Sequence, residues 1–143
     1  MNTWLLLHYK LPSKPSALRV YIWRKLKHIG AILFHEAVWV LPDNPRTAEQ
    51  IQWLAAEIQE MGGNAYYWKA STILGEHEQS ILRQFNEQVD AVYSDLLKRL
   101  EKPRADLQEI SKQYQQAASQ DFFKSKLGLL VREKLTSKRG EKP

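Results

Sequence analysis

The spacing of hydrophobic residues changes along the chain, and it predicts short strands and helices first and long helices afterwards. Residues 3–11 form a short apolar run that is ended by Pro12 and Pro15, which is typical of a strand buried on both faces. Helical stripes follow over 16–29 and 47–61, and the apolar runs AILFHE and AVWVLP between them predict two further strands. NAYYWKA, at 64–70, predicts the last strand of this region.

The order of these elements predicts an α+β fold. Strand, helix, strand, strand, helix, strand is the ferredoxin-like βαββαβ arrangement, in which an antiparallel sheet carries both helices on one face. We expect Ser16 to cap the first helix, and Thr47 with Gln50 to form a capping box for the second. Between the two middle strands, His35 and Glu36 offer no strong turn dipeptide.

Beyond Gly75 the pattern becomes helical throughout. An apolar stripe over 76–101 predicts one long helix, a second helix is expected just beyond Pro103, and a third after Ser119 or Asp121. The third segment carries the apolar residues Phe122, Phe123, Leu127, Leu130 and Val131. We therefore predict two structural units, a ferredoxin-like unit at 1–75 and a helical hairpin or bundle at 76–143. The stripe of the long helix should be buried by the later helices, and the final SKRGEKP should be frayed.

Composition narrows the class of protein without naming a function. The chain has 143 residues, 43% of them hydrophobic, and a net charge of +5, which is compatible with an anionic partner. It has no cysteine, so disulfides, thiol catalysis and sulfur-ligated zinc are excluded. No apolar run approaches the roughly 20 residues of a membrane span, and the start lacks the features of a signal peptide. We expect a cytoplasmic protein that does not contact membranes.

Three blocks of sequence resemble a known family. WLLLHYKLPSKPSALRVYIWRKLKHIGA, AVWVLPDNPRTAEQIQWLAAEIQEMGGNA and SQDFFKSKLG together resemble the N-terminal region of the chromate resistance protein ChrB. That resemblance implies a chromate-responsive regulator of a chromate-efflux operon. The helix, glycine and VWV-P pattern is also similar to the ferredoxin-like middle domain of the phenylacetate repressor PaaX and to small CRISPR adaptation subunits, which supports the fold.

The family also bears on partners and sensing. Its members continue into a further C-terminal domain, whereas this sequence ends at Pro143. We therefore do not carry chromate sensing over directly. The expected partners are DNA, an oxyanion such as chromate, a second copy of the chain, or a separate protein that supplies the C-terminal domain.

The helix at 16–29 carries the candidate contacts to nucleic acid. Arg19, Trp23 and Lys27 recur every four residues and share a face, while Arg24 and His28 share a neighbouring one. Arginine and lysine can bind phosphates, and tryptophan can stack on bases. The candidates are Lys14, Arg19, Trp23, Arg24, Lys27 and Arg46. The alternative is that they form the solvated side of a packing helix, with Trp23 partly buried.

A second candidate lies at the start of the same helix. Lys14 and Ser16 flank the first turn, where free backbone N–H groups and the helix dipole favour a phosphate or a tetrahedral oxyanion such as chromate. Every capped helix has such N–H groups, so a plain helix cap explains the same residues.

Enzymatic and metal sites have little support. His8, His28, His35 and His77 lack the spacing of metal ligands, and acidic residues around His77 are expected at a helix start. Asp43 fits a turn, and there is neither a glycine-rich phosphate loop nor a nucleophile elbow. We expect that the protein is not an enzyme and that it has no catalytic residues, metal or cofactor. The remaining alternatives are a regulator that acts through DNA or a partner, and a structural or dimerising module.

Overall fold

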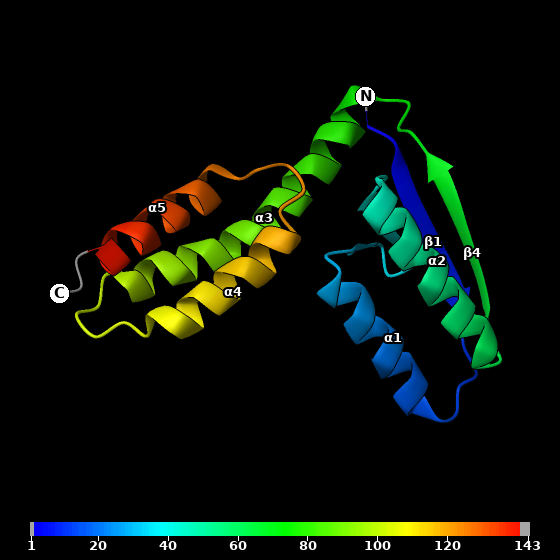
Figure 1. Ribbon diagram of the computed structural model, residues 1–143. Coiled ribbons are helices and arrows are strands. Elements are labelled where there is room, and N and C mark those ends of the chain that lie inside the picture. The colour runs from blue at the N-terminus through cyan, green and yellow to red at the C-terminus, as the bar shows by residue number, and fades with distance from the viewer. Residues whose placement is uncertain (1, 141–143) are drawn as a thin grey trace. The chain divides into compact units, whose positions relative to one another are not determined.

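The computed structural model describes residues 2–140, which form two compact units that divide after Glu78 (Figure 1). The elements of the first unit are β1 (Trp4–Lys10), α1 (Ser16–His28), β2 (Ile32–Phe34), β3 (Val38–Pro42), α2 (Pro45–Glu60) and β4 (Asn64–Ala70). The sheet has four strands in the order β2-β3-β1-β4, and every neighbouring pair is antiparallel. This is the predicted ferredoxin-like arrangement, and the prediction is confirmed.

Both helices of the first unit lie side by side on one face of the sheet (Figure 1). The core between the layers includes Ile22 and Leu26 of α1, Ile58 of α2 and Leu7 of β1, none of which has exposed surface. A fully buried aliphatic side chain of this size stabilises the fold by about 1.5–3 kcal/mol. Burial of these apolar stripes therefore holds both helices on the sheet.

Strand β1 is buried on both faces at its start, as predicted. Successive side chains of a strand point to opposite faces, and both Trp4 and Leu5 are buried. Burial decreases towards the other end, where Lys10 is exposed.

Both predicted helix caps are wrong by position. Pro15 occupies the cap of α1, no side chain caps it, and Ser16 is the first helical residue. In α2 the cap is Asn44, whose side chain accepts from the backbone N–H of Thr47 at 2.9 Å, while Thr47 Oγ1 accepts from the backbone N–H of Asn44 at 3.0 Å. Thr47 thus stands at the third helical position, and α2 begins earlier, at Pro45, because proline fits the first turn.

The hairpin between β2 and β3 turns through residues that seldom adopt this conformation. His35 and Glu36 have φ angles of 51° and 58°, and the N–H of Ala37 donates to the carbonyl of Phe34 at 2.9 Å. Two consecutive positive φ angles are the mark of the type I′ hairpin turn, which usually uses Asn or Gly. The turn shortens β2 to three residues, so the predicted strand AILFHE is longer than the observed one.

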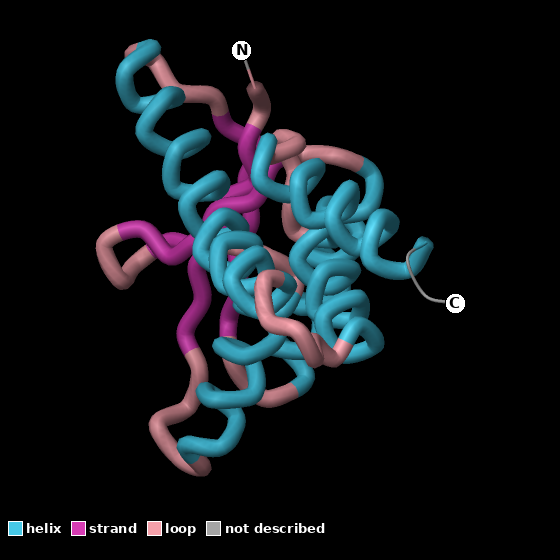
Figure 2. Tube along the Cα trace, turned by 90° about the vertical axis from the view of Figure 1, so that its left-hand side faces the viewer, coloured by secondary structure: helices cyan, strands magenta, loops and turns pink. Residues whose placement is uncertain are grey.

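The second unit is helical. It comprises most of α3 (Gly75–Leu100), together with α4 (Leu107–Ser119) and α5 (Lys126–Gly140), which are drawn as cyan coils in Figure 2. The stripe of α3 is buried by the later helices, as predicted. The buried cluster contains Val89, Tyr93, Leu96, Leu100, Leu107, Ile110, Ala117, Val131 and Leu135.

The segment before α5 differs from its prediction. Phe122 and Phe123 do not lie on a helix but precede α5, and both rings meet the ring of Phe85 edge-on, with centroids 5.8 and 5.9 Å away. A turn at Asp121 replaces the first part of the predicted helix, because the Asp121 carboxylate accepts from the backbone N–H of Ser125 at 3.0 Å. The same carboxylate accepts from the Tyr93 hydroxyl at 3.1 Å.

The last helix extends close to the end of the chain. Helix α5 continues to Gly140, so residues 137–140 are helical, and fraying of this segment stays a prediction. Residues 141–143 lie outside the described part of the chain. None of the helices in residues 2–140 has both the length and the apolar character needed to cross a bilayer.

Candidate functional site

The solvent side of α1 carries the predicted basic and aromatic residues. Arg19, Arg24 and Lys27 are exposed, and Trp23 is 49% exposed. The buried residues Ile22 and Leu26 point in the other direction and fix the rotation of the helix on the sheet. Four of the predicted nucleic-acid contacts therefore share one exposed helix surface.

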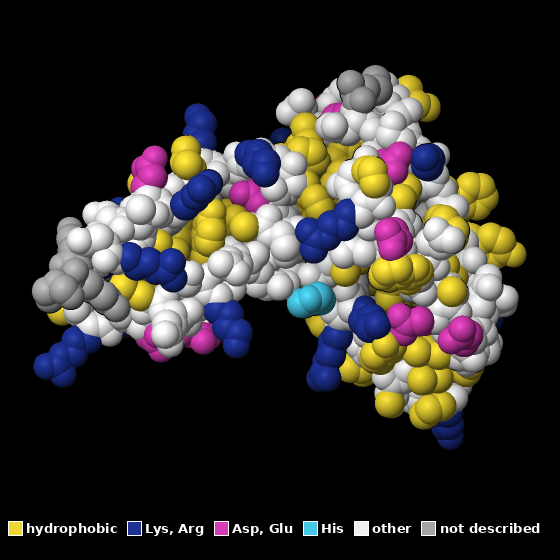
Figure 3. All heavy atoms as spheres, viewed as in Figure 1, with side chains coloured by type: hydrophobic (Ala, Val, Ile, Leu, Met, Phe, Trp, Pro, Cys, Tyr) yellow, Lys and Arg dark blue, Asp and Glu magenta, His cyan; other side chains and the backbone are white. Residues whose placement is uncertain are grey.

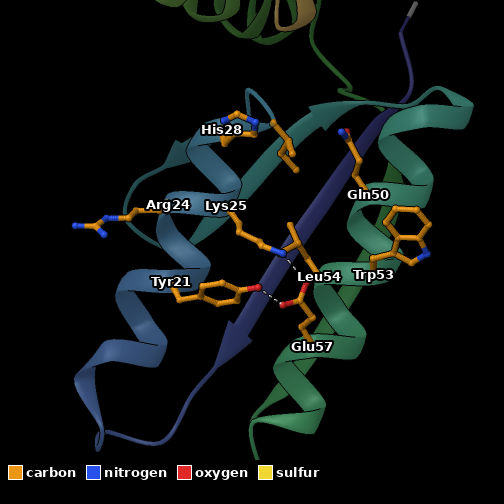
Figure 4. A pocket seen from close by; sticks show the side chains of 9 residues that line it. Tyr21, Arg24, Lys25, His28, Gln50, Trp53, Leu54 and Glu57 are labelled. Carbon is orange, nitrogen blue, oxygen red and sulfur yellow. Dashed lines mark hydrogen bonds and ion pairs between the residues drawn. The ribbon is translucent and has the colours of Figure 1, made fainter. Parts of the chain in front are cut away.

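One flank of α1 borders a groove against α2 (Figure 4). The groove has a volume of about 650 Å³. Its lining residues are Tyr21, Arg24, Lys25, His28, Ile29, Gln50, Trp53, Leu54 and Glu57. Figure 4 shows the end of the Arg24 side chain directed away from α2, so its guanidinium is presented to solvent rather than to the groove.

A small polar cluster links the two helices that border this groove. The Tyr21 hydroxyl donates to Glu57 Oε2 at 2.7 Å, and Lys25 Nζ donates to Glu57 Oε1 at 3.0 Å (Figure 4). Lys25 also lies 4.9 Å from the Tyr21 ring centroid. The Tyr21 hydrogen bond and then the Lys25 interaction hold the pKa of Glu57 below its ordinary value, whereas hydrogen bonds with Tyr21 and Glu57 raise the pKa of Lys25. Lys25 is thus engaged within the protein.

The other flank of α1 borders a groove that is partly lined by the sheet. Arg19 and Trp23 border a second groove, of about 560 Å³, together with Tyr9 and Trp39 of the sheet. Burial raises the pKa of the Tyr9 hydroxyl, although a hydrogen bond with Trp39 and the charge of Arg19 act in the opposite direction. Lys27 Nζ lies 5.9 Å from the Trp23 ring centroid, within the range of a cation–π contact. Arg19 and Trp23 therefore line a different groove from Arg24 and His28, and Lys27 lines neither of the two.

The remaining two candidates are far from each other. Helices α1 and α2 are antiparallel, because Lys25 pairs with Glu57 while His28, at the end of α1, shares its groove with Gln50 near the start of α2. Lys14 precedes α1 and Arg46 lies in the first turn of α2. Both are exposed, but they lie at opposite ends of the helix layer, so the structure does not bring them into one site.

The predicted oxyanion site at the start of α1 has little structural basis. Lys14 and Ser16 are both exposed, and the Ser16 side chain does not cap the helix. The first turn contains no acidic residue, which is favourable for an anion. This leaves a helix N-terminus with one neighbouring lysine, and no buried group that would select a tetrahedral anion.

The surface around α1 is mixed rather than uniformly basic. Figure 3, viewed as Figure 1, shows Lys and Arg side chains interspersed with acidic and hydrophobic ones over the helix layer of the first unit. A surface of this kind suits a few localised phosphate contacts better than a continuous electrostatic track.

One acidic residue has a role that the sequence did not indicate. The helix dipole alone accounts for an acid near the start of α3, but Glu78 is buried, and its carboxylate accepts from the backbone N–H of Asn2 at 2.9 Å and from the Thr72 hydroxyl at 3.4 Å. The hydrogen bond from Asn2 lowers the pKa of Glu78. The residue therefore fastens the start of β1 to the start of α3.

A cluster of aromatic residues was missed altogether. His8 of β1 lies between Tyr66 and Trp68 of β4, with ring centroids 5.7 and 6.0 Å away. The signal in the sequence was the run of three aromatic residues in NAYYWKA, but only the pairing of β1 with β4 shows which of them meet His8. As for metals, among residues 2–140 no group of three or more His, Asp and Glu side chains could hold an ion.

The amino-acid sequence is similar to proteins of one known family. A family model described as "Protein ChrB, N-terminal" matches residues 19–121. The Protein ChrB of Cupriavidus metallidurans (strain ATCC 43123 / DSM 2839 / NBRC 102507 / CH34) is 30% identical over 78 residues, which cover 54% of this chain and 24% of that protein. The match thus spans about a quarter of the relative's length. No solved structure matches the chain significantly.

Proposed function

Since this chain belongs to the family of Protein ChrB, N-terminal, we propose that it is a regulatory protein of chromate resistance that acts by contacting DNA. The resemblance to ChrB supports the pathway, and the exposed surface of α1 supports the contact. We propose no catalytic role, and DNA phosphates rather than a small molecule are the ligand of α1.

The observation that carries this proposal is the exposure of Arg19, Arg24 and Lys27 on one short helix. Glu57, which lines the groove with Arg24, is already bonded to Tyr21 and Lys25. Glu36 lines the other groove together with Arg19. Arginine binds phosphate through two parallel N–H groups, and each phosphate contact releases counterions from the duplex. Such binding positions a protein on DNA without reading its sequence.

Direct reading of bases by α1 is not part of the proposal. The described elements of the first unit follow the βαββαβ order rather than that of a helix-turn-helix, the motif that presents a recognition helix to the major groove. We therefore expect similar affinity for duplexes of different sequence.

The test compares two variants that each remove three positive charges. The first replaces Arg19, Arg24 and Lys27 by Gln, and the control replaces Lys112, Arg132 and Lys134, which are exposed helical residues of the second unit, by Gln. Anisotropy of a labelled duplex is titrated at two salt concentrations. The first variant should bind more weakly, and its salt slope should fall by about 0.9 for each phosphate that is no longer neutralised, whereas the control should resemble wild type.

Two results would overturn the proposal. Equally weakened binding by both variants would show that net charge alone is responsible. No binding by wild type below about 100 µM, the weak end of non-specific affinity, would favour the alternative of a dimerising module, which sedimentation would then reveal.

A further inference from the structure

The face of the sheet opposite the helices carries a line of aromatic side chains. His8 pairs with Tyr66 and Leu6 pairs with Trp68 in the β1–β4 register. Directly paired residues of antiparallel strands share a face, and successive residues alternate. Leu7 points towards the helices, so His8, Tyr66 and Trp68 lie on the other face.

These three side chains form one contiguous aromatic cluster, which we call the aromatic plate. Trp68 Nε1 donates to His8 Nε2 at 2.8 Å, and the two ring planes differ by 12°. The N–H lies in the plane of the indole and the accepting lone pair lies in the plane of the imidazole. Near-parallel rings joined by this bond are therefore edge to edge rather than face to face. The Tyr66 ring is inclined by only 21° to His8.

The aromatic plate is accessible to solvent, and the indole N–H of Trp68 already has a hydrogen-bond acceptor within it. Tyr66 is 61% exposed and Trp68 is 53% exposed, although burying a large aromatic ring is strongly favourable. The Trp68 N–H is satisfied by His8, which fixes both rings. What remains for a ligand is the exposed surface of the two rings, of which Trp68 is held in place by His8.

The charge beside the aromatic plate favours an anionic ligand. Lys10 pairs with Asn64 at the end of β1, lies on the same face as His8 and is exposed. Neither β1 nor β4 contains Asp or Glu. Lys69 of β4 lies on the helix-covered face, where it pairs with Asp43 Oδ2 at 3.5 Å, so Lys10 is the lysine of these two strands that lies beside the aromatic plate. A planar partner that carries negative charge therefore fits this face better than a neutral or cationic one.

We propose that the aromatic plate stacks unpaired bases of single-stranded nucleic acid, while Lys10 contacts a neighbouring phosphate. Base stacking on aromatic side chains is tolerant of sequence because every base has a π face, and cations beside the rings follow the backbone. This site is separate from α1, which was proposed to contact duplex phosphates only.

The first experiment needs no variant. Wild-type protein is titrated into a labelled 12-mer of dT, and into an abasic 12-mer that has the same phosphates without bases. Stacking predicts at least tenfold tighter binding of the dT strand. Equal affinities, or no binding of either strand, would overturn the proposal whether or not α1 binds duplex DNA.

The second experiment assigns the binding to the aromatic plate. Tyr66→Thr with Trp68→Thr keeps β propensity, and we expect it to weaken dT binding roughly tenfold or more with little change for the abasic strand. The matched control is Tyr67→Thr, which removes an aromatic residue that is 48% exposed on the opposite face of β4 and should bind as wild type. If the double variant binds dT normally but alters the sedimentation of the protein, the aromatic plate is instead an interface with a second copy, and the proposal is wrong.

Discussion

The two units use their aromatic side chains in opposite ways. Among the described residues, the large aromatic side chains that are exposed all belong to the first unit, namely Tyr21, Trp23, Trp53, Tyr66, Tyr67 and Trp68. In the second unit Phe85 and Tyr93 are almost completely buried. Contiguous exposed apolar patches can mark interaction sites. We therefore expect recognition to depend on the first unit, whereas the buried aromatic residues of the second unit serve internal packing.

The segment SQDFFKSKLG shows how the second unit packs. Asp121 bonds to the Tyr93 hydroxyl, Phe122 and Phe123 contact Phe85, and Gly128 lies against the Tyr93 ring. Burial, followed by the negative charge of Asp121, raises the pKa of Tyr93 strongly, so its hydroxyl stays protonated and keeps donating. This block of the family resemblance therefore reflects the construction of a helical core.

The largest effect should come from the core of the second unit. Leu96 has no exposed surface and lies in the buried cluster. Leu96→Ala should lower the free energy of unfolding by about 2–5 kcal/mol, the usual cost of deleting a buried leucine side chain. The measurement is a denaturant titration followed by circular dichroism. Leu129→Ala, at a residue that is 59% exposed, is the control, and equal midpoints for the two variants would contradict the burial of the α3 stripe.

A somewhat smaller effect is expected where α5 approaches α3. A Cβ added at Gly128 would lie 2.8 Å from two ring carbons of Tyr93, a buried residue that cannot easily move. Gly128→Ala should therefore destabilise the protein by about 1–3 kcal/mol, the usual cost of overpacking, despite the better helix propensity of alanine. At Gly75 an added Cβ would meet nothing within 4 Å. A thermal melt of Gly75→Ala should show no decrease in stability, and a similar decrease in both variants would exclude the close approach as the cause.

In the first unit, the start of α2 depends on its cap. Asn44→Ala removes the acceptor for the Thr47 N–H and should cost about 1 kcal/mol. Gln52→Ala changes an exposed residue of the same helix and should leave the melting temperature nearly unchanged. If the two variants melt alike, the capping box does not stabilise the helix.

The smallest effect concerns the link between α1 and α2. Because the pKa of Glu57 is lowered in the folded state, its contribution is present above the ordinary carboxyl pKa and is lost as the pH falls through the folded value. The pKa of Lys25 is raised, so the pair persists at neutral pH. A double-mutant cycle with Lys25→Met and Glu57→Gln should give a coupling of about 0.2–1 kcal/mol at neutral pH. A coupling that survived in strong acid would show that the charges are not responsible.

Much of the fold was predictable because hydrophobic periodicity is strong in this chain. The strand at 64–70 and the helix at 16–29 agree with β4 and with α1 to within a residue. The errors occur where local chemistry permits two interpretations. Thr47 matches a capping box, but Asn44 can cap as well, and Pro45 after it decides the position. Likewise, His35 and Glu36 adopt positive φ angles without the glycine or asparagine that would have marked the turn.

The candidate sites were predictable only where they follow a single element. The basic surface of α1 depends on helical spacing, and the exposures of Arg19, Arg24 and Lys27 agree with it. The aromatic plate depends on the register of two strands, in which His8 meets Tyr66. A shift of one residue would have turned one set of side chains to the opposite face, and nothing within either strand fixes that register. A site of this kind can be identified only once the structure gives the pairing of the two strands.

The placement of the tryptophans gives this protein a built-in optical reporter. All five occur in the first unit; Trp4 and Trp39 are buried, while Trp23, Trp53 and Trp68 are exposed. Intrinsic emission therefore reads the first unit alone, and the described residues of the second unit contribute no indole signal. Its exposed indoles should be quenched readily by iodide or acrylamide and its buried ones slowly, so a quenching curve resolves ligand contact from unfolding. A single Trp68→Phe substitution would then identify the fraction of emission that belongs to the aromatic plate.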